Sequence, residues 1–364
     1  MYSFTPTEEQ QMLLDAVKRY AEQDIRPAAR EADEKSELPP DLIEKGWELG
    51  VLQASIPEEY DGFGEYSGLT GVLAAEAMAH GDLSTALGVM TPNLFALPIF
   101  FAGSEDQKKE YLPSVIGGEW KPYSAGMIEP TFNFDPHDLS TTAVVKGKSI
   151  KITGEKTYVP YAADAEALLI YANLEGKTQA FIVPKGTAGL TIGEKQKTLG
   201  IHAYPLYSVT LEDVEIPLSQ QLNGAEGHDM DSILASSHIA LAAMTVGVAQ
   251  AAFEYARDYA KDREVFGVKV AQKQAIAFMI ADMGIEIEAT RLLAWEAAWM
   301  LDEGKEEAAK HAYLAYNGAV DMVMMVTDQA VQILGGHGYI REHPVEMWMR
   351  NGRGFAAFTG LAIV

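Results

Sequence analysis

Two groups of residues in the last third of the chain have the types and spacing that suit a phosphate-bearing ligand. One is a glycine-rich run that contains Gly335, Gly336 and Gly338. Residues without a Cβ let main-chain N–H groups approach an adenylate or a pyrophosphate closely. The other is Arg263, whose guanidinium can offer paired donors to two oxygens of a diphosphate. Taken alone, Arg263 followed by Gly267 is typical of a solvated helix end. Because the sequence also contains the glycine run, we interpret Arg263 as a ligand contact.

Both groups resemble motifs of the acyl-CoA dehydrogenase flavoprotein family. The run from Gln332 to Tyr339, followed by Arg350 and Arg353, is similar to the family's Gln-x-x-Gly-Gly-x-Gly-Tyr signature. Arg263-x-x-Phe266-Gly267 with Gln274 resembles its Arg-x-x-Phe-Gly…Gln element, and residues 103–119 are similar to a third family segment. The resemblance covers almost all of the chain and implies FAD as the cofactor.

The resemblance also implies which residues contact FAD. Arg263 would pair with the pyrophosphate, while Phe266 and Gln274 would meet the adenine end across a subunit boundary. Gln332, Gly335 and Gly336 would close the backbone around the FAD of a neighbouring subunit. On the flavin side, the family pattern places the main chain of Met127 and Ile128 beside the ring, and Tyr158 in place of the Trp that covers one of its faces. Pro160 replaces a Ser or Thr whose N–H reaches flavin N5, so we expect hydride transfer at N5 to be retuned.

The catalytic positions depart from the family pattern. Counting forward from Arg350 and Arg353 places Thr359 where the family has the Glu that removes the substrate α-proton. A second lineage carries its base at the position of Ser237, so neither carboxylate is present. His238 stands where many members have an Arg near the pantetheine, and imidazole titrates near neutrality. His238 is therefore a candidate substitute base, although a lone His on a bundle helix is more often a packing residue.

Composition excludes several other classes of protein. The 364 residues are 48% hydrophobic and 22% charged, an ordinary globular balance. A net charge of −24 disfavours nucleic acid and anionic membranes, and makes an anionic CoA ester depend on a locally basic pocket. The chain has no cysteine, metal-ligand motif, P-loop or serine-hydrolase motif. We expect no metal, no bilayer-spanning apolar stretch, and a cytoplasmic protein without a signal peptide.

Hydrophobic periodicity divides the chain into three regions. Residues 1–120 have helical spacing, beginning with a capping pair at Thr7 and Gln10. Residues 121–225 alternate with period two and contain a hairpin-turn pattern at Lys146-Gly147-Lys148, and residues 226–364 return to long helical stripes. The resemblance agrees with this order. We expect an α+β protein of acyl-CoA dehydrogenase type, with an N-terminal helical domain, a middle β domain and a C-terminal four-helix bundle.

Three functions are compatible with these motifs. The first is an active flavoenzyme on an acyl-CoA thioester, with electron-transfer flavoprotein or a similar acceptor as its partner. The second is a non-catalytic FAD-binding subunit in a hetero-oligomer with a paralogue, and the third is a flavin monooxygenase- or oxidase-like relative. The cross-subunit role of Phe266, Gln274 and the Gly pair predicts a dimer or tetramer in each case.

Overall fold

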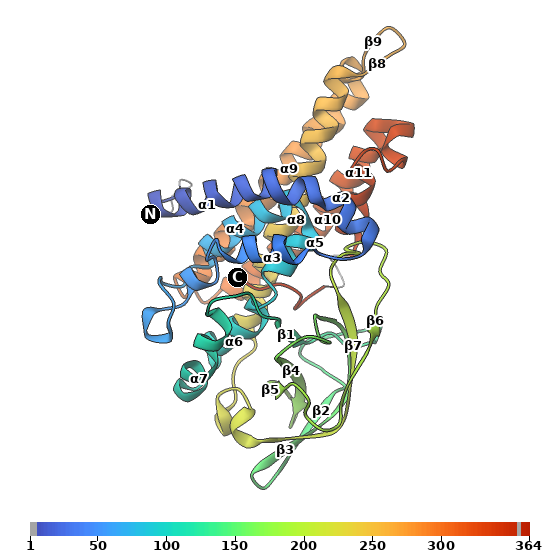
Figure 1. The fold of residues 1–364 in the computed structure, drawn as a ribbon. Helices are drawn as coiled ribbons and strands as arrows, with labels where there is room; N and C mark the ends of the chain where they lie inside the picture. The colour runs from blue at the N-terminus through green and yellow to red at the C-terminus, as the bar shows by residue number, and fades with distance from the viewer. Residues whose placement is uncertain (1–5, 355–357) are drawn as a thin grey trace.

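The computed structural model describes residues 6–354 and 358–364, so residues 1–5 of the N-terminal segment discussed above lie outside it. The elements follow the predicted order of helical, β and helical regions (Figure 1). The helices of the first region are α1 (Glu8–Tyr20), a π-helical turn (Ala21–Ile25), α2 (Arg26–Lys35), α3 (Pro40–Trp47), α4 (Gly68–Gly81), α5 (Leu83–Val89), α6 (Asn93–Ala102) and α7 (Glu105–Ile116).

Local sequence accounts for where these helices begin. Thr7 and Gln10 form the expected reciprocal capping box at the start of α1, since each side chain bonds the other's backbone N–H. Ser104 and Gln107 repeat the arrangement at α7. Both boxes satisfy N–H groups that the first turn of a helix leaves without partners.

The middle region is a sheet of seven strands within the described residues. The strands are β1 (Tyr123–Gly126), β2 (Thr142–Lys146), β3 (Ser149–Pro160), β4 (Ala167–Leu174), β5 (Lys177–Pro184), β6 (Leu190–Lys195) and β7 (Leu206–Pro217). The predicted turn at Gly147, which has φ +66°, joins β2 and β3 as an antiparallel hairpin. β3 also pairs with β7, with a register shift between Lys156 and Val159 that breaks the regular ladder beside Tyr158.

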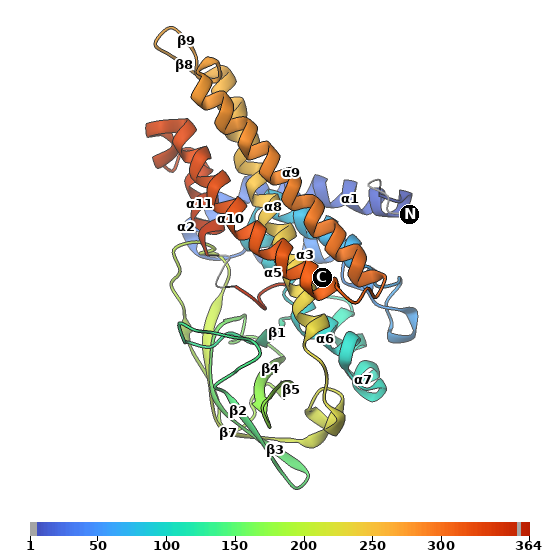
Figure 2. The same ribbon diagram turned by 180° about the vertical axis from the view of Figure 1, so that it is seen from behind.

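The third region is the bundle, with α8 (Asp231–Asp262), α9 (Gln274–Asp302), α10 (Ala308–Leu334) and the short α11 (Val345–Arg353). α9, α10 and the N-terminal α4 all pack on α8, which is therefore the central helix of the molecule. The two-stranded hairpin of β8 (Glu264–Val265) and β9 (Val268–Lys269) lies at the end of the molecule opposite the sheet (Figure 1). Seen from behind, α9 and α10 run side by side (Figure 2).

The expectation that no apolar stretch is long enough to cross a bilayer is wrong for α8. Its length and composition meet that criterion, with a mean hydropathy of 1.6 over an 18-residue window. However, 94% of that window is buried inside the protein. A central helix packed on all sides has the same composition, so burial accounts for this one.

A buried ion pair fixes the chain immediately after β1. Glu129 accepts hydrogen bonds from Lys156 Nζ at 2.7 Å, from Ser140 N at 2.7 Å and from Thr141 N at 2.8 Å. Burial alone would raise the pKa of Glu129, but these donors outweigh burial and lower the pKa to about 2. Lys156 Nζ also donates to Met127 O at 3.2 Å, so one ammonium group holds both Glu129 and the main chain two residues before it.

We expect Lys156→Met to lower the free energy of unfolding by about 3–5 kcal/mol, because it leaves the Glu129 carboxylate buried without its counter-charge. Since the pKa of Glu129 is depressed in the fold, its contribution is present above the ordinary value of 4.5 and is lost as pH falls towards about 2. Denaturant unfolding across this pH range measures both effects. Lys185→Met is the matched control: Lys185 and Glu166 are half-exposed and 3.8 Å apart, so their pair should contribute at most about 1 kcal/mol. Equal losses in the two variants would contradict the prediction.

Candidate functional site

Thr359 lies in a tight turn that packs against the end of β1. Leu361 N donates to Phe358 O at 2.9 Å, and Gly360 has φ +87°, which together with a negative φ at Thr359 makes a type II turn. A Cβ at Gly360 would stand 2.7 Å from Met127 Sδ, so glycine is required both for the backbone and for the close approach. The structure thereby packs the Thr359 turn, through Gly360, against Met127, a predicted flavin contact.

The segment after this turn, residues 358–364, is a buried strap across the helices. Gly360 N donates to Ser237 Oγ at 3.0 Å, and Asn93 Nδ2 donates to Ile363 O at 3.2 Å. Ser236 Oγ and Tyr66 Oη both donate to Val364 O. These hydrogen bonds tie the strap to the segment before α4, to α6 and to α8, and so hold the Thr359 turn in place.

His238 lies among aromatic side chains next to the turn. Its ring stacks on Tyr316 with centroids 4.9 Å apart, and Tyr313 covers its edge at 5.7 Å. Thr359 Oγ1 donates to Tyr316 Oη at 3.5 Å, so Tyr316 touches both predicted catalytic positions. Burial, followed by the nearby His137, lowers the pKa of His238 to about 4. The imidazole is thus neutral at pH 7, and the same burial makes it a weaker base than a free imidazole.

The predicted flavin contacts on the β side lie around the same turn. Met127 and Ile128 are buried directly after β1, and Ile128 O accepts from Thr157 N at 2.9 Å. Tyr158 has φ +53° at the irregularity of β3, where its N–H donates to Gln196 Oε1 at 3.0 Å. Its ring meets Phe358 edge-on at 6.2 Å. Met127, Ile128, Tyr158 and Thr359 therefore form one half of the candidate site.

The other predicted contacts gather at the far end of the bundle. A hollow of about 330 Å³ is lined by Arg263, Gly335, Gly336 and their neighbours Tyr259 and His337. The Arg263 side chain is exposed and makes no ion pair within the described residues. A Cβ on Gly335 or Gly336 would meet nothing within 4 Å, and Gly335 has φ +58°. The hollow thus combines a guanidinium that has no ion pair within the described residues with open glycine backbone, and these features fit a diphosphate.

The remaining predicted contacts do not line this hollow. Phe266, at the tip of the β8–β9 hairpin, is 92% exposed. Gln274 begins α9 and Gln332 lies in the last turn of α10, and both are exposed. The exposed ring of Phe266 is therefore available for contact with another molecule.

The two halves of the candidate site are far apart within one chain. From Ser237, beside Thr359, to Asp262, beside Arg263, α8 rises by about 38 Å at about 1.5 Å per residue. The β8–β9 hairpin and β1 lie in separate parts of the molecule (Figure 1). A single dinucleotide does not span this distance, so one chain does not bring all of the predicted contacts around one cofactor.

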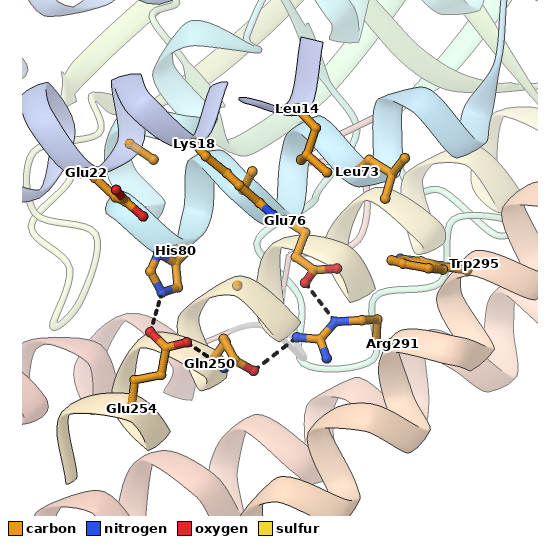
Figure 3. A pocket seen from close by; sticks show the side chains of 13 residues that line it. Leu14, Lys18, Glu22, Leu73, Glu76, His80, Gln250, Glu254, Arg291 and Trp295 are labelled. Atoms are coloured by element: carbon orange, nitrogen blue, oxygen red, sulfur yellow. Dashed lines mark hydrogen bonds and ion pairs between the residues drawn. The ribbon is translucent and has the colours of Figure 1, made fainter. Parts of the chain in front are cut away.

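A separate cavity of about 410 Å³ lies between α1, α4, α8 and α9 and contains none of the predicted residues (Figure 3). Arg291 Nε donates to Glu76 Oε1 at 2.8 Å, and Arg291 also donates to Gln250 Oε1 at 3.0 Å. Gln250 donates in turn to Glu254, which bonds His80 Nε2 at 2.9 Å. The network joins three helices, while Glu76 Oε2 and Trp295 Nε1 in the cavity wall are buried without a hydrogen-bond partner.

Sequence reasoning missed several residues that shape the site. Tyr316 and Tyr313 lie on α10, where a helical stripe of apolar residues predicts only packing. Gln196 follows β6 in a loop, and its amide also donates to Thr157 Oγ1 at 2.7 Å. Nothing in their spacing connects these residues with Thr359, because the contacts join distant parts of the chain.

Comparisons with known proteins match the chain to one family. Family models described as acyl-CoA dehydrogenase N-terminal, middle and C-terminal domains match residues 7–119, 124–214 and 228–362. A cyclohex-1-ene-1-carbonyl-CoA dehydrogenase of Geobacter metallireducens is 34% identical, over 97% of this chain and 95% of the relative.

Two solved structures match over nearly the whole chain. Butyryl-CoA dehydrogenase from Megasphaera elsdenii is 31% identical with a TM-score of 0.89, over 100% of this chain and 96% of the other. A chain from work on the electron transferring flavoprotein of Acidaminococcus fermentans is 33% identical with a TM-score of 0.90, over 99% and 96%. These matches confirm the predicted resemblance, the predicted fold class and FAD as the cofactor.

We expect Arg263→Ala to weaken FAD binding by about 10- to 150-fold, because the cofactor loses a charge-assisted pair of hydrogen bonds worth about 1.5–3 kcal/mol. Flavin fluorescence on titration of apoprotein measures the dissociation constant. Arg257→Ala is the matched control, since Arg257 lies on α8, which ends just before Arg263, but pairs with its neighbour Asp258 at 2.8 Å. An unchanged constant for Arg263→Ala would remove Arg263 from the cofactor site.

Proposed function

Because the chain belongs to the acyl-CoA dehydrogenase family, we propose that it is an FAD-dependent oxidoreductase that desaturates an acyl-CoA thioester between Cα and Cβ, with Thr359 at the usual position of the base. The observation that carries the proposal is the Thr359 turn, which is seated between Met127 and Ser237 beside the predicted flavin contacts. FAD, when bound, supplies the acceptor for the β-hydride.

The main chain of Thr359 can act on the substrate without its side chain. Its N–H donates no hydrogen bond within the described residues. A fixed, unpaired N–H can donate to the thioester carbonyl oxygen and stabilise the negative charge that develops there as the α-proton leaves. This function depends on the backbone alone, so it survives the replacement of Glu by Thr.

The proton acceptor is the position that this sequence has changed. A Thr hydroxyl is far too weak a base, whereas His238 is neutral at pH 7 and lies one side chain away, through Tyr316. We assign the α-proton to the His238 imidazole: the Cα–H bond breaks, its electron pair moves into the nascent Cα–Cβ double bond, and the proton goes to a ring nitrogen.

A second copy of the chain would complete the cofactor site. The separation of the two half-sites along α8 supports FAD bound between two copies, each supplying one half. α9 also exposes an apolar stripe, with Phe278 59%, Ile285 64% and Leu292 41% exposed at intervals of seven residues. Such a stripe on one helix face suits burial against another subunit. We therefore assign a homodimer or tetramer. As the electron acceptor we propose an electron-transfer flavoprotein or a similar carrier.

The missing carboxylate favours one alternative function. In a hetero-oligomer with a Glu-bearing paralogue, this chain would supply its Arg263 half-site to the partner's FAD and carry out no chemistry itself. Reduction of the flavin by acyl-CoA in the purified homo-oligomer separates the two, because a supporting subunit alone would leave the flavin oxidised.

In the His238→Asn background, which lacks the proposed base, we expect Thr359→Glu to raise the rate of flavin reduction by a fitting saturated acyl-CoA by about 10²–10⁴-fold, the contribution of a positioned general base. Anaerobic stopped-flow bleaching with several chain lengths measures the rate. Thr359→Gln is the matched control, since it has the shape of Glu but cannot accept the proton. If Thr359→Glu and Thr359→Gln behave alike while both bind acyl-CoA, Thr359 does not face Cα.

For His238→Asn we expect a loss of about 10²-fold or more in the wild-type background and little change in the Thr359→Glu background, which has its own base. Because the pKa of His238 is lowered to about 4, the neutral form dominates above that value, and the wild-type rate should decline only as pH falls towards 4. His311→Asn, which alters a histidine paired with Glu296 away from the site, is the control. A decline centred near pH 6.5 or equal losses in both backgrounds would exclude His238 as the base.

A further inference from the structure

A polar pocket of about 750 Å³ opens at the start of α8 and contains none of the predicted site residues. Its lining comes from the turn between β4 and β5 (residues 174–179), from the segment that leads into α8 (residues 225–230), and from His137, and we call it the His137 pocket. Its volume is that of a small-molecule site.

Two segments join the His137 pocket to the proposed reaction centre. Met230 of the lining directly precedes α8, and His238 lies about 12 Å further along that helix at about 1.5 Å per residue. On the other side, a loop runs from the buried Glu129, beside the predicted flavin contacts, to His137. After burial, His137 is the group that most affects the pKa of His238, so the two imidazoles are within electrostatic reach. An acyl thioester whose Cα lies at the Thr359 turn can therefore extend its outer end along these two segments to the pocket.

Carboxylates outnumber cations in this pocket. Lys177 is the one Lys or Arg among the described residues that line it, whereas three exposed carboxylates do so: Glu175, Glu226 and Asp229. None of these four groups forms an ion pair within the described residues. Burial lowers the pKa of His228 to about 4, so this imidazole is neutral at pH 7. Even with a proton on His137, the pocket keeps a negative excess.

The outer half of CoA has the same sign of charge as the pocket. It carries a diphosphate and a 3′-phosphate, and the protein's net charge of −24 adds to the repulsion. We infer that the site takes acyl-pantetheine thioesters and selects against the nucleotide half of CoA. This inference rests on the proposed desaturation and narrows its substrate class. The chemistry at Cα and Cβ is unchanged, because CoA and pantetheine thioesters share the acyl group and the pantetheine arm.

The first test compares three product thioesters on the FAD-loaded full-length protein. Crotonyl-CoA, crotonyl-4′-phosphopantetheine and crotonyl-pantetheine differ only in the groups beyond the arm. Perturbation of the flavin absorbance spectrum measures each dissociation constant at ionic strengths of about 0.01 M and about 0.15 M, where the Debye length is about 30 Å and about 8 Å. At the lower ionic strength we expect crotonyl-pantetheine to bind about tenfold more tightly than crotonyl-CoA, with the phosphopantetheine ester between them. The difference should shrink at the higher ionic strength, because salt screens repulsion.

The second test reverses two charges of the pocket. We expect Glu175→Lys/Glu226→Lys to tighten crotonyl-CoA binding about tenfold at low ionic strength and to leave crotonyl-pantetheine within about twofold. Glu48→Lys/Glu65→Lys is the matched control, because it changes the net charge equally at exposed positions outside the pocket lining. The control should leave both dissociation constants within about twofold of wild type.

The outcomes separate this inference from the proposed function. Crotonyl-CoA binding as tightly as crotonyl-pantetheine, or more tightly, at low ionic strength would overturn the inference. Equal effects of the two double variants would also overturn it, because the repulsion would then come from the net charge and not from the pocket. In both cases the desaturation stands if butyryl-CoA or butyryl-pantetheine reduces the flavin anaerobically. If neither ester reduces the flavin, the desaturation fails, and if no crotonyl thioester binds, the inference fails with it.

Discussion

The burial of the strap at residues 358–364 is the constraint on which the rest of the candidate site depends. Phe358, Leu361, Ala362, Ile363 and Val364 are each at most 7% exposed. The strap meets Met127 after β1, Asn93 on α6 and Ser236 and Ser237 on α8, and a Cβ at Gly71 of α4 would stand 2.7 Å from Val364. One short segment thus joins all three regions of the chain, and its tight packing allows Thr359 little choice of position.

The replacement of a carboxylate by Thr359 changes the physical demands on the pocket. A Glu at this position would have to bury a charge, whereas a threonine hydroxyl needs only a hydrogen-bond partner. Tyr316 supplies that partner and stacks on His238, so the space around the turn is filled by neutral aromatic groups. The turn itself can contribute only a hydrogen bond from its backbone N–H. The proton acceptor therefore has to come from a neighbouring helix.

The half-site around Arg263 lies at the surface, whereas the strap is buried. Around Arg263 and the Gly335–Gly336 pair, the described part of the chain gives the guanidinium no ion pair and leaves glycine backbone uncovered at the surface. Tyr259 Oη bonds His337 Nδ1 at 2.7 Å, and both side chains line the hollow beside the glycine run. Exposed apolar residues at Phe266 and along α9 extend the same surface. These features favour a site that is completed when two copies of the chain assemble. A single chain, in contrast, completes the buried turn.

The sequence alone determined what depends on local preference and motif. Thr7 with Gln10 predicted the start of α1, Gly147 predicted the β2–β3 turn, and the glycine run with Arg263 indicated the cofactor. Motif register also singled out Thr359 as the unusual position. Only the tertiary structure placed Ser237 and Tyr316 against the Thr359 turn, since these partners lie 123 and 43 residues away along the chain. Hydrophobic periodicity specifies which face of a helix is buried, but not which distant segment packs against that face. That choice is made by side-chain packing of the whole chain, because a contact between remote residues exists only when all the intervening elements are in place.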